Sequence, residues 1–181
     1  MNRIVLVTLL TVAVIAVVGC GGSSTTQTTA TSAGSATTQA SATSRENPAP
    51  LGTEAQVGDW TVKVVSANLN ANTAVKGAIG YQDPAPGDQY VLVNLEATYN
   101  GDKTDSFLVG LTYQIVGSKG NTFPPAEIGI DKSIEDTNEV YKGATVSGAL
   151  VFEVPSDQID GAVLDMLPTI SLNDSTYFAL R

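Results

Sequence analysis

The chain has 181 residues, with 18 acidic and 9 basic side chains, no histidine and a single cysteine. This length suits one domain of ordinary size with a tail, rather than a two-domain enzyme with a cleft between its domains. The net charge of −9 has the wrong sign for a phosphate backbone, so we expect no nucleic-acid partner. The lack of histidine removes the usual general base at neutral pH and the commonest ligand for zinc or copper.

Residues 1–19 have the pattern of a secretory signal peptide. A short positive end, Met1-Asn2-Arg3, leads into an uncharged apolar stretch from Ile4 to Val18. As a helix this stretch would span about 22 Å, less than the roughly 30 Å hydrocarbon core of a membrane. No charged stop-transfer cluster follows it, so the pattern favours a cleaved signal over a permanent membrane span.

The apolar stretch ends in Val17-Val18-Gly19-Cys20, which resembles the lipobox of bacterial lipoproteins. The resemblance implies cleavage between Gly19 and Cys20 and acylation of Cys20, with chains such as palmitate. The competing interpretation is an ordinary signal peptide with a cysteine nearby by chance. Two or three acyl chains, at about 0.8 kcal/mol per buried methylene, would anchor the protein stably to the extracytoplasmic face of the bacterial cell membrane.

Residues 20–50 are predicted to be the lipidated cysteine and a disordered stalk. Residues 21–44 are all Gly, Ser, Thr, Ala or Gln, which cannot form a core. A flexible chain of about 30 such residues reaches roughly 30 Å. O-linked glycosylation, which would stiffen the stalk, is an alternative. Pro48 and Pro50 favour an extended backbone at its end, and the folded domain is expected to span residues 51–181.

The apolar residues of this domain repeat with the period of two that is typical of β-strands. In residues 90–99, one face carries Val91, Val93, Leu95, Ala97 and Tyr99, whereas Asn94, Glu96 and Thr98 occupy the other. Trp60 begins another alternation and is expected in the core. The expected strands are residues 60–69, 90–99, 111–116, 122–123, 145–155, 162–167 and 176–180.

Turn-rich segments separate these strands, and no segment has the pattern of an amphipathic helix. About seven or eight short strands predict an all-β fold, an antiparallel immunoglobulin-like β-sandwich. A small closed β-barrel is the alternative, because counting strands cannot separate the two. The longer stretch 126–142 is expected to be an exposed and comparatively mobile acidic connection, which Ile128, Ile130 and Ile134 could hold against a sheet edge.

Three motifs, VGDWTVKV, GDQYVLVNLEATYNGDK and KGATVSG leading into VFEVP, resemble a family of small bacterial exported domains. These are telokin-like, immunoglobulin-type β-sandwiches similar to a mycobacterial immunoprotective extracellular protein, and they commonly follow low-complexity stalks on lipoproteins. The resemblance covers most of residues 57–154 and implies the fold but no activity. The chain departs from the family pattern in the 126–142 insertion and in having no immunoglobulin-type disulfide.

The acidic residues offer two candidate groups for chemistry. The first is Asp131, Glu135, Asp136 and Glu139, whose oxygens could bind calcium, but their spacing differs from that of an EF-hand loop. A solvated acidic loop is the simpler interpretation. The second is Asp102 and Asp105, which turn formation explains without catalysis.

Other catalytic signatures are absent from the sequence. It has no Ser-x-x-Lys for a serine nucleophile, no phosphate-binding loop and no dinucleotide motif. We therefore expect no catalytic residue, no metal and no cofactor. Tyr81, beside Asp-Pro in a loop, is a candidate for an exposed contact residue.

These features predict a lipid-anchored, non-catalytic binding or interaction module of the bacterial cell envelope, with an unidentified protein or small-molecule partner. The alternative is a carrier or accessory lipoprotein for a small or lipidic ligand, and a less favoured one is an enzyme with paired carboxylates. An apolar cavity between the sheets would favour the carrier, and a polar face with one hydrophobic patch the interaction module. Paired buried carboxylates in a cleft would favour the enzyme.

Overall fold

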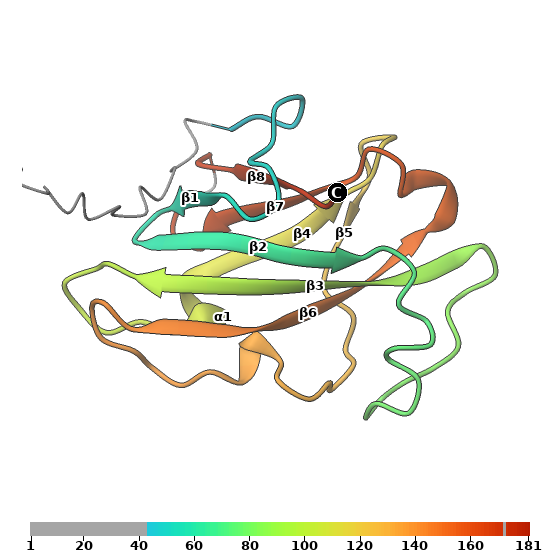
Figure 1. Ribbon diagram of the computed structural model, residues 1–181, viewed down its shortest axis with the longest axis horizontal. Coiled ribbons are helices and arrows are strands. Elements are labelled where there is room, and N and C mark those ends of the chain that lie inside the picture. The colour runs from blue at the N-terminus through green and yellow to red at the C-terminus, as the bar shows by residue number, and fades with distance from the viewer. Residues whose placement is uncertain (1–42, 172) are drawn as a thin grey trace, which may run out of the picture. The chain divides into compact units, whose positions relative to one another are not determined.

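The computed structural model describes residues 43–171 and 173–181 (Figure 1). The predicted signal peptide, Cys20 and residues 20–42 of the predicted stalk lie outside the described residues. Within the described part of the chain, no helix is long and apolar enough to cross a membrane.

Eight strands make up most of the described structure: β1 (Glu54–Val57), β2 (Trp60–Asn68), β3 (Asp88–Tyr99), β4 (Leu111–Val116), β5 (Thr122–Phe123), β6 (Thr145–Pro155), β7 (Val163–Pro168) and β8 (Thr176–Ala179). The helical elements are short: α1 (Phe107–Gly110) and the 3-10 helices η1 (Ile134–Asp136) and η2 (Ser156–Gln158). The sequence indicated every strand except β1, whose four residues include only two apolar ones, Ala55 and Val57, too few to show alternation.

The strands form two four-stranded sheets that pack face to face (Figure 1). The first sheet has the order β1-β2-β3-β6, and the second has the order β5-β4-β7-β8. All neighbouring strands are antiparallel. Two separate sheets, rather than one sheet closed on itself, confirm the predicted immunoglobulin-like β-sandwich against the barrel alternative.

The apolar core between the sheets, here called the inner core, contains the residues that the alternation predicts. The five apolar residues expected on one face of β3 are all buried: Val91, Val93, Leu95, Ala97 and Tyr99. Trp60 is also in the inner core, with 1% of its surface exposed. Its ring contacts those of Tyr99 and Phe107, at centroid separations of 5.0 and 5.9 Å. Burying each large apolar side chain contributes about 2 kcal/mol, which makes this core the main source of stability.

A second apolar cluster, here called the outer cluster, lies on the opposite face of β3 and β6. Its buried residues are Ala71, Val75, Tyr90 and Val151, and the hydrophobics packed against them are Tyr81, Leu92, Ala126, Ile128 and Ile130. The cover comes from the connections between β2 and β3 and between β5 and β6. The ring of Tyr81 packs against that of Tyr90 in a tilted arrangement, with a centroid separation of 5.9 Å. It is therefore half-buried, rather than the exposed contact residue that the sequence suggested.

Nine of the 17 residues in the segment 126–142 are exposed, as expected, but the segment also reaches the inner core, which we did not expect. Ile134 is fully buried in the inner core, and Ser133 pairs with Ala149 at the edge of β6. Since Ile128 and Ile130 pack in the outer cluster, the segment passes from one face of the sheet to the other around this edge. The three isoleucines hold the segment against the edge of β6, as the sequence suggested, because they find apolar surface on both faces of the sheet.

Gly148 permits this close approach to β6. A Cβ atom at this position would lie 2.5 Å from the backbone nitrogen of Ile134 and 2.6 Å from the carbonyl oxygen of Lys132. That carbonyl accepts a hydrogen bond of 3.0 Å from the backbone N–H of Ala149. Any larger residue at position 148 would have to push the segment away from the sheet.

Contacts with the sandwich begin before Leu51, where we expected the domain to start. Ala49 is buried and pairs with Phe178 of β8. Further upstream, the guanidinium group of Arg45 donates to the carbonyl of Gly117 at 2.8 Å. Ala49 therefore covers the edge of β8, and Arg45 contacts the turn that follows β4.

Candidate functional site

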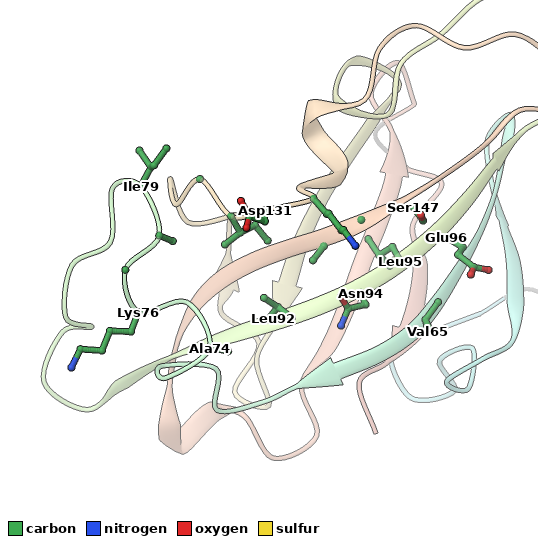
Figure 2. Close-up of a pocket in the computed structure, with 17 residues that line it drawn as sticks. Val65, Ala74, Lys76, Ile79, Leu92, Asn94, Leu95, Glu96, Asp131 and Ser147 are labelled. Atoms are coloured by element: carbon green, nitrogen blue, oxygen red, sulfur yellow. The ribbon is translucent and has the colours of Figure 1, made fainter.

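A groove of about 700 Å³ lies on the outer face of the first sheet. Figure 2 shows side chains along its floor, among them Leu92 and Asn94 of β3 and Ser147 of β6. Residues 74–79 and 129–132, from two different connections, form its rim. The sheet thus supplies a rigid base, and loops far apart in the sequence supply the borders.

The two parts of the rim are hydrogen-bonded to each other. The backbone N–H of Ile79 donates to the carbonyl of Gly129 at 3.2 Å, and the N–H of Gly129 donates to the carbonyl of Ile79 at 2.8 Å. This pair is an antiparallel bridge. It holds the two loops together over the end of the groove next to the outer cluster.

Small residues make the surface hollow at this position. Of the 17 residues that line the groove, seven are glycine, alanine or serine. They are Ala74, Gly77, Ala78, Gly129, Ser147, Gly148 and Ala149. Because these residues have little or no side chain, the space between the two loops stays open.

Two exposed apolar side chains line the groove, Val65 with 46% and Ile79 with 83% of their surface exposed. The exposure of Val65 follows from a bulge in β2, where the register shifts between Val64 and Ser66. Val64 keeps its place in the inner core, so the inserted residue is left on the solvent side. Figure 2 shows the two residues on opposite sides of the groove, and exposed apolar side chains beside a hollow are typical of binding surfaces.

The groove also carries charges of both signs. Glu96 forms an ion pair with Lys63 of the neighbouring strand. The four ion pairs found between described residues do not include Lys76, Asp131 or Lys132, which also line the groove. The rim therefore carries two lysines and one aspartate outside these ion pairs, and Figure 2 shows the Lys76 side chain extending away from the floor.

A second hollow, here called the end pocket, has a volume of about 440 Å³. It lies at one end of the sandwich, where the turn between β1 and β2 approaches α1 and the end of β7. Trp60 and Leu111 are buried in its floor, whereas Val109 and Ile170 are 68% and 98% exposed. The end pocket thus joins the inner core to an exposed apolar border.

The acidic residues that the sequence suggested for calcium do not converge. Asp131 lines the groove, whereas Glu135 accepts a hydrogen bond of 2.7 Å from the hydroxyl of Tyr113. Asp136 and Glu139 are exposed. In residues 43–171 and 173–181, no group of three or more Asp, Glu, Cys or His side chains could hold a metal ion.

Asp102 and Asp105 have separate partners. The Lys142 ammonium lies 2.7 Å from Asp102, and this hydrogen bond lowers the pKa of the Asp102 carboxyl. Asp105 accepts hydrogen bonds from the Trp60 indole N–H at 3.1 Å and from the backbone N–H of Ser106 at 2.8 Å. Asp105 therefore orients Trp60 and the start of α1, a structural role that its place in a turn did not indicate.

Of the carboxylates in the described residues, only that of Asp165 in β7 is buried, with 4% of the residue exposed. One of its oxygens accepts a hydrogen bond from the Gln114 amide at 3.0 Å, and the other has no partner in the described structure. Gln114 is its register partner in β4. The carboxylate is thus held by a neutral amide and not by a second acid.

Sequence reasoning missed the residues that border both hollows. Ile79 in the stretch KGAIGY, between two glycines, is an isolated apolar residue in a loop, and Ile170 follows the proline that ends β7. An isolated isoleucine beside turn residues is the available signal, because such a residue cannot belong to the face of a regular strand. Its position beside a hollow depends on loop pairing, which the sequence does not indicate.

Several solved structures resemble the chain. A conserved hypothetical protein from Bacillus anthracis has 12% identity and a TM-score of 0.44, over 72% of this chain and 95% of that chain. The yjhA protein from Bacillus subtilis has 13% identity and a TM-score of 0.46, over 74% and 99%. A candidate lipoprotein, ycdA from Bacillus subtilis, has 14% identity and a TM-score of 0.45, over 69% and 37%. The comparison with curated proteins gives no match.

One family of domains matches the sequence directly. It is described as a domain of unknown function, DUF4352, and the match spans residues 49–169. This range includes the strands from β1 to β7 and all the residues that line the groove. The match covers more than half of the chain, which therefore belongs to the DUF4352 family.

Proposed function

We propose that this protein is a non-catalytic binding module, anchored by a lipid to the extracytoplasmic face of a bacterial cell membrane, and that its groove holds a segment of a partner protein. One observation carries the proposal. Of the six large apolar side chains exposed among the described residues, four line a hollow: Val65 and Ile79 in the groove, and Val109 and Ile170 in the end pocket.

The composition of the groove supports a polypeptide as its ligand. Leu92 and Val65 provide apolar contacts, and the amide of Asn94 and the hydroxyl of Ser147 provide hydrogen bonds nearby. Charged residues of both signs lie around them. Apolar and polar groups thus lie next to each other in the groove, as they do in protein–protein interfaces.

The carrier and enzyme hypotheses have less support. The space between the sheets is filled by large side chains, among which Trp60, Phe107, Phe152 and Phe178 are each less than 2% exposed. A carrier would need a cavity there. An enzyme with paired carboxylates would need two of them in one cleft, and in the described part of the chain the one buried carboxylate, that of Asp165, has an amide as its partner.

The lipid anchor and the resemblance to telokin-like domains are also part of this proposal. The lipobox pattern at Val17-Val18-Gly19-Cys20 supports acylation of Cys20 after cleavage at Gly19. The turn and strand motifs quoted above support a telokin-like variant of the sandwich, similar to the mycobacterial immunoprotective protein.

The anchor is tested by metabolic labelling with palmitate in a bacterial host. We expect label in the full chain and none in Cys20→Ser, because Cys20 is the chain's only cysteine. Equal labelling of the two proteins would refute acylation at this position.

The groove is tested with a photo-crosslinking amino acid placed at Ile79, in cells that express the anchored chain. We expect a specific crosslinked product, which disappears when Ser147→Trp fills the floor. Thr145→Trp is the matched control, because Thr145 is also exposed and lies two residues away on the same face of β6, outside the groove. A product that survives Ser147→Trp, or that Thr145→Trp removes equally, contradicts binding in the groove.

A further inference from the structure

The end pocket has acidic but no basic residues among those that line it. Asp59, Asp105 and Asp174 contribute three carboxylates from three different segments, and none of the lysines and arginines in the described residues lines the pocket. The ion pairs within the described chain involve other acids, namely Glu96, Asp157, Asp102 and Asp160. None of these three carboxylates therefore forms an ion pair with a described residue. Lys142, which pairs with Asp102, lies near Asp59, because the charge of Asp59 adds to the effect of Asp102 in raising the pKa of this lysine.

The hydrogen bonds of these carboxylates come from neutral donors. Asp105 accepts from the Trp60 indole at 3.1 Å, and Asp174 accepts from the hydroxyl of Ser171. At the same end of the sandwich, burial and then the charges of Asp105 and Asp59 raise the pKa of the Tyr99 hydroxyl. The pocket is consequently a region of negative potential.

Apart from Thr169 and Ser171, the remainder of the pocket is apolar, and packing holds it in place. The backbone of Gly58 turns with a φ of +57° between β1 and β2, and a Cβ atom there would come within 2.7 Å of the Pro168 side chain. Gly58 and Pro168 thus fix the turn against the end of β7. Val109 and Ile170 stand exposed beside this contact, where a ligand could cover them.

We propose that the end pocket binds a lysine or arginine side chain that is flanked by apolar residues in a partner polypeptide. The charge complements three carboxylates that form no ion pair with a described residue, and the flanking residues bury Val109 and Ile170. A guanidinium or ammonium group also carries a long aliphatic stem, which suits a pocket with apolar walls. This inference goes beyond the proposed function, because the end pocket shares no lining residue with the groove.

A membrane surface is the other occupant that exposed aliphatic residues could suggest. Inserting Val109 and Ile170 into a bilayer would bring three carboxylates to the lipid boundary, where removing charge from water is unfavourable. Anionic lipids would add electrostatic repulsion. The charges therefore favour a basic polypeptide over a lipid surface.

The test uses the chain's only tryptophan, Trp60, as a reporter in the pocket. The purified full chain is reconstituted in phosphatidylcholine vesicles, and the tripeptide amide acetyl-Leu-Arg-Leu is titrated while Trp60 emission is recorded. The matched probes are acetyl-Leu-Gln-Leu, which lacks the charge, and acetyl-Gly-Arg-Gly, which lacks the apolar flanks. We expect saturable binding of the first probe with a Kd of about 1 mM or below, and binding at least tenfold weaker for the other two.

Variants then locate the binding. Asp59→Asn and Asp174→Asn should each weaken binding of acetyl-Leu-Arg-Leu several-fold, as should Ile170→Ser. Glu127→Gln is the control for net charge, because Glu127 is exposed and does not line the end pocket. Thermal unfolding of each variant verifies that it is folded.

Three outcomes would overturn the inference. One is equal affinity for the arginine and glutamine probes, and another is the same loss of affinity in Glu127→Gln as in Asp59→Asn. The third is strong quenching of Trp60 by vesicles made with brominated acyl chains, which would identify a lipid as the occupant. None of these results depends on Ser147 or the groove, so the inference and the proposed function can fail separately.

Discussion

The inner core and the outer cluster differ in how they are built. In the inner core, strands from both sheets contribute regular rows of apolar residues, and Val62, Val93 and Leu150 are each 1% exposed or less. In the outer cluster, β3 and β6 supply Tyr90, Leu92 and Val151, and irregular connections supply the rest. A face of a sheet can therefore be covered without a second sheet, provided that loops carry apolar residues to it.

The groove lies where this cover stops. Beyond the bridge between Ile79 and Gly129, the outer face carries Asn94, Ser147 and Glu96 instead of large apolar residues. The loops that bury the outer cluster thus also make the rim of the candidate site. Their stability should control the shape of the groove, whereas the inner core should control whether the domain folds.

The largest effect is expected for Ile134→Ala, which tests whether the segment 126–142 belongs to the inner core. Ile134 is fully buried, so the substitution should lower the free energy of unfolding by about 4 kcal/mol through lost burial and a residual cavity. Urea denaturation measures this change. The control is Ile170→Ala, because Ile170 is 98% exposed and its removal should leave stability nearly unchanged. Similar losses for the two variants would contradict the comparison.

Gly148→Ala should have the next largest effect, because the added Cβ would collide with the backbone of Lys132 and Ile134. We expect a loss of about 3 kcal/mol in the free energy of unfolding. Gly143→Ala is the matched control, since a Cβ atom at this position meets nothing within 4 Å. The alanine would, however, have to keep the φ of +85° that Gly143 has. The left-handed backbone alone should cost about 1 kcal/mol. If the control is as destabilised as Gly148→Ala, the close approach to β6 is not the cause.

Ile134 and Gly148 also show how far the sequence could predict the fold. Alternation located β3, β6 and the burial of Trp60, because a regular strand places every second residue on the same face. For Ile134 the sequence suggested a contact with a sheet edge, but not its place in the inner core, which it reaches around the edge of β6. The approach depends on Gly148, which in the sequence is indistinguishable from a turn glycine.

The candidate site was harder to predict than the fold. The groove requires the bulge that exposes Val65 and the pairing of Ile79 with Gly129, fifty residues further along the chain. Neither the bulge nor the loop pairing produces a local pattern in the sequence. The acidic residues attracted attention because carboxylates often carry chemistry, yet Glu135 and Asp105 instead accept hydrogen bonds from Tyr113 and Trp60.

A pair of valine substitutions compares the two apolar clusters directly. Val93 in the inner core and Val151 in the outer cluster are 0% and 3% exposed, and both lie in central parts of long strands. We expect Val93→Ala to cost about 2.5 kcal/mol and Val151→Ala about 1.5 kcal/mol, because loops can collapse into a cavity more easily than a second sheet can. Chemical denaturation of both variants measures the difference. If Val151→Ala lowers the free energy of unfolding as much as Val93→Ala or more, the loop cover is at least as rigid as the sheet packing.

The smallest effect is expected for the hydrogen bond that joins the inner core to the segment 126–142. The hydroxyl of Tyr113, in the inner core, donates to Glu135 of the segment 126–142 at 2.7 Å. Tyr113→Phe removes this bond and should cost about 1 kcal/mol at neutral pH. The same variant should change the response to alkali, because burial and then the neighbouring Glu135 raise the pKa of Tyr113 well above its ordinary value.

Because the pKa of Tyr113 is raised in the folded protein, alkali should lower the free energy of unfolding. In the unfolded chain a tyrosine loses its proton near pH 10, whereas folded Tyr113 keeps it, so the stabilisation is complete below about pH 10 and is lost as the pH rises further. In Tyr113→Phe, the free energy of unfolding should therefore fall less steeply above pH 10, by up to about 1.4 kcal/mol per pH unit. Glu135→Gln keeps a hydrogen-bond acceptor and should retain most of the wild-type slope, because burial is the larger cause. If Tyr113→Phe keeps the wild-type slope, the Tyr113 hydroxyl is not the group that links the segment to the inner core.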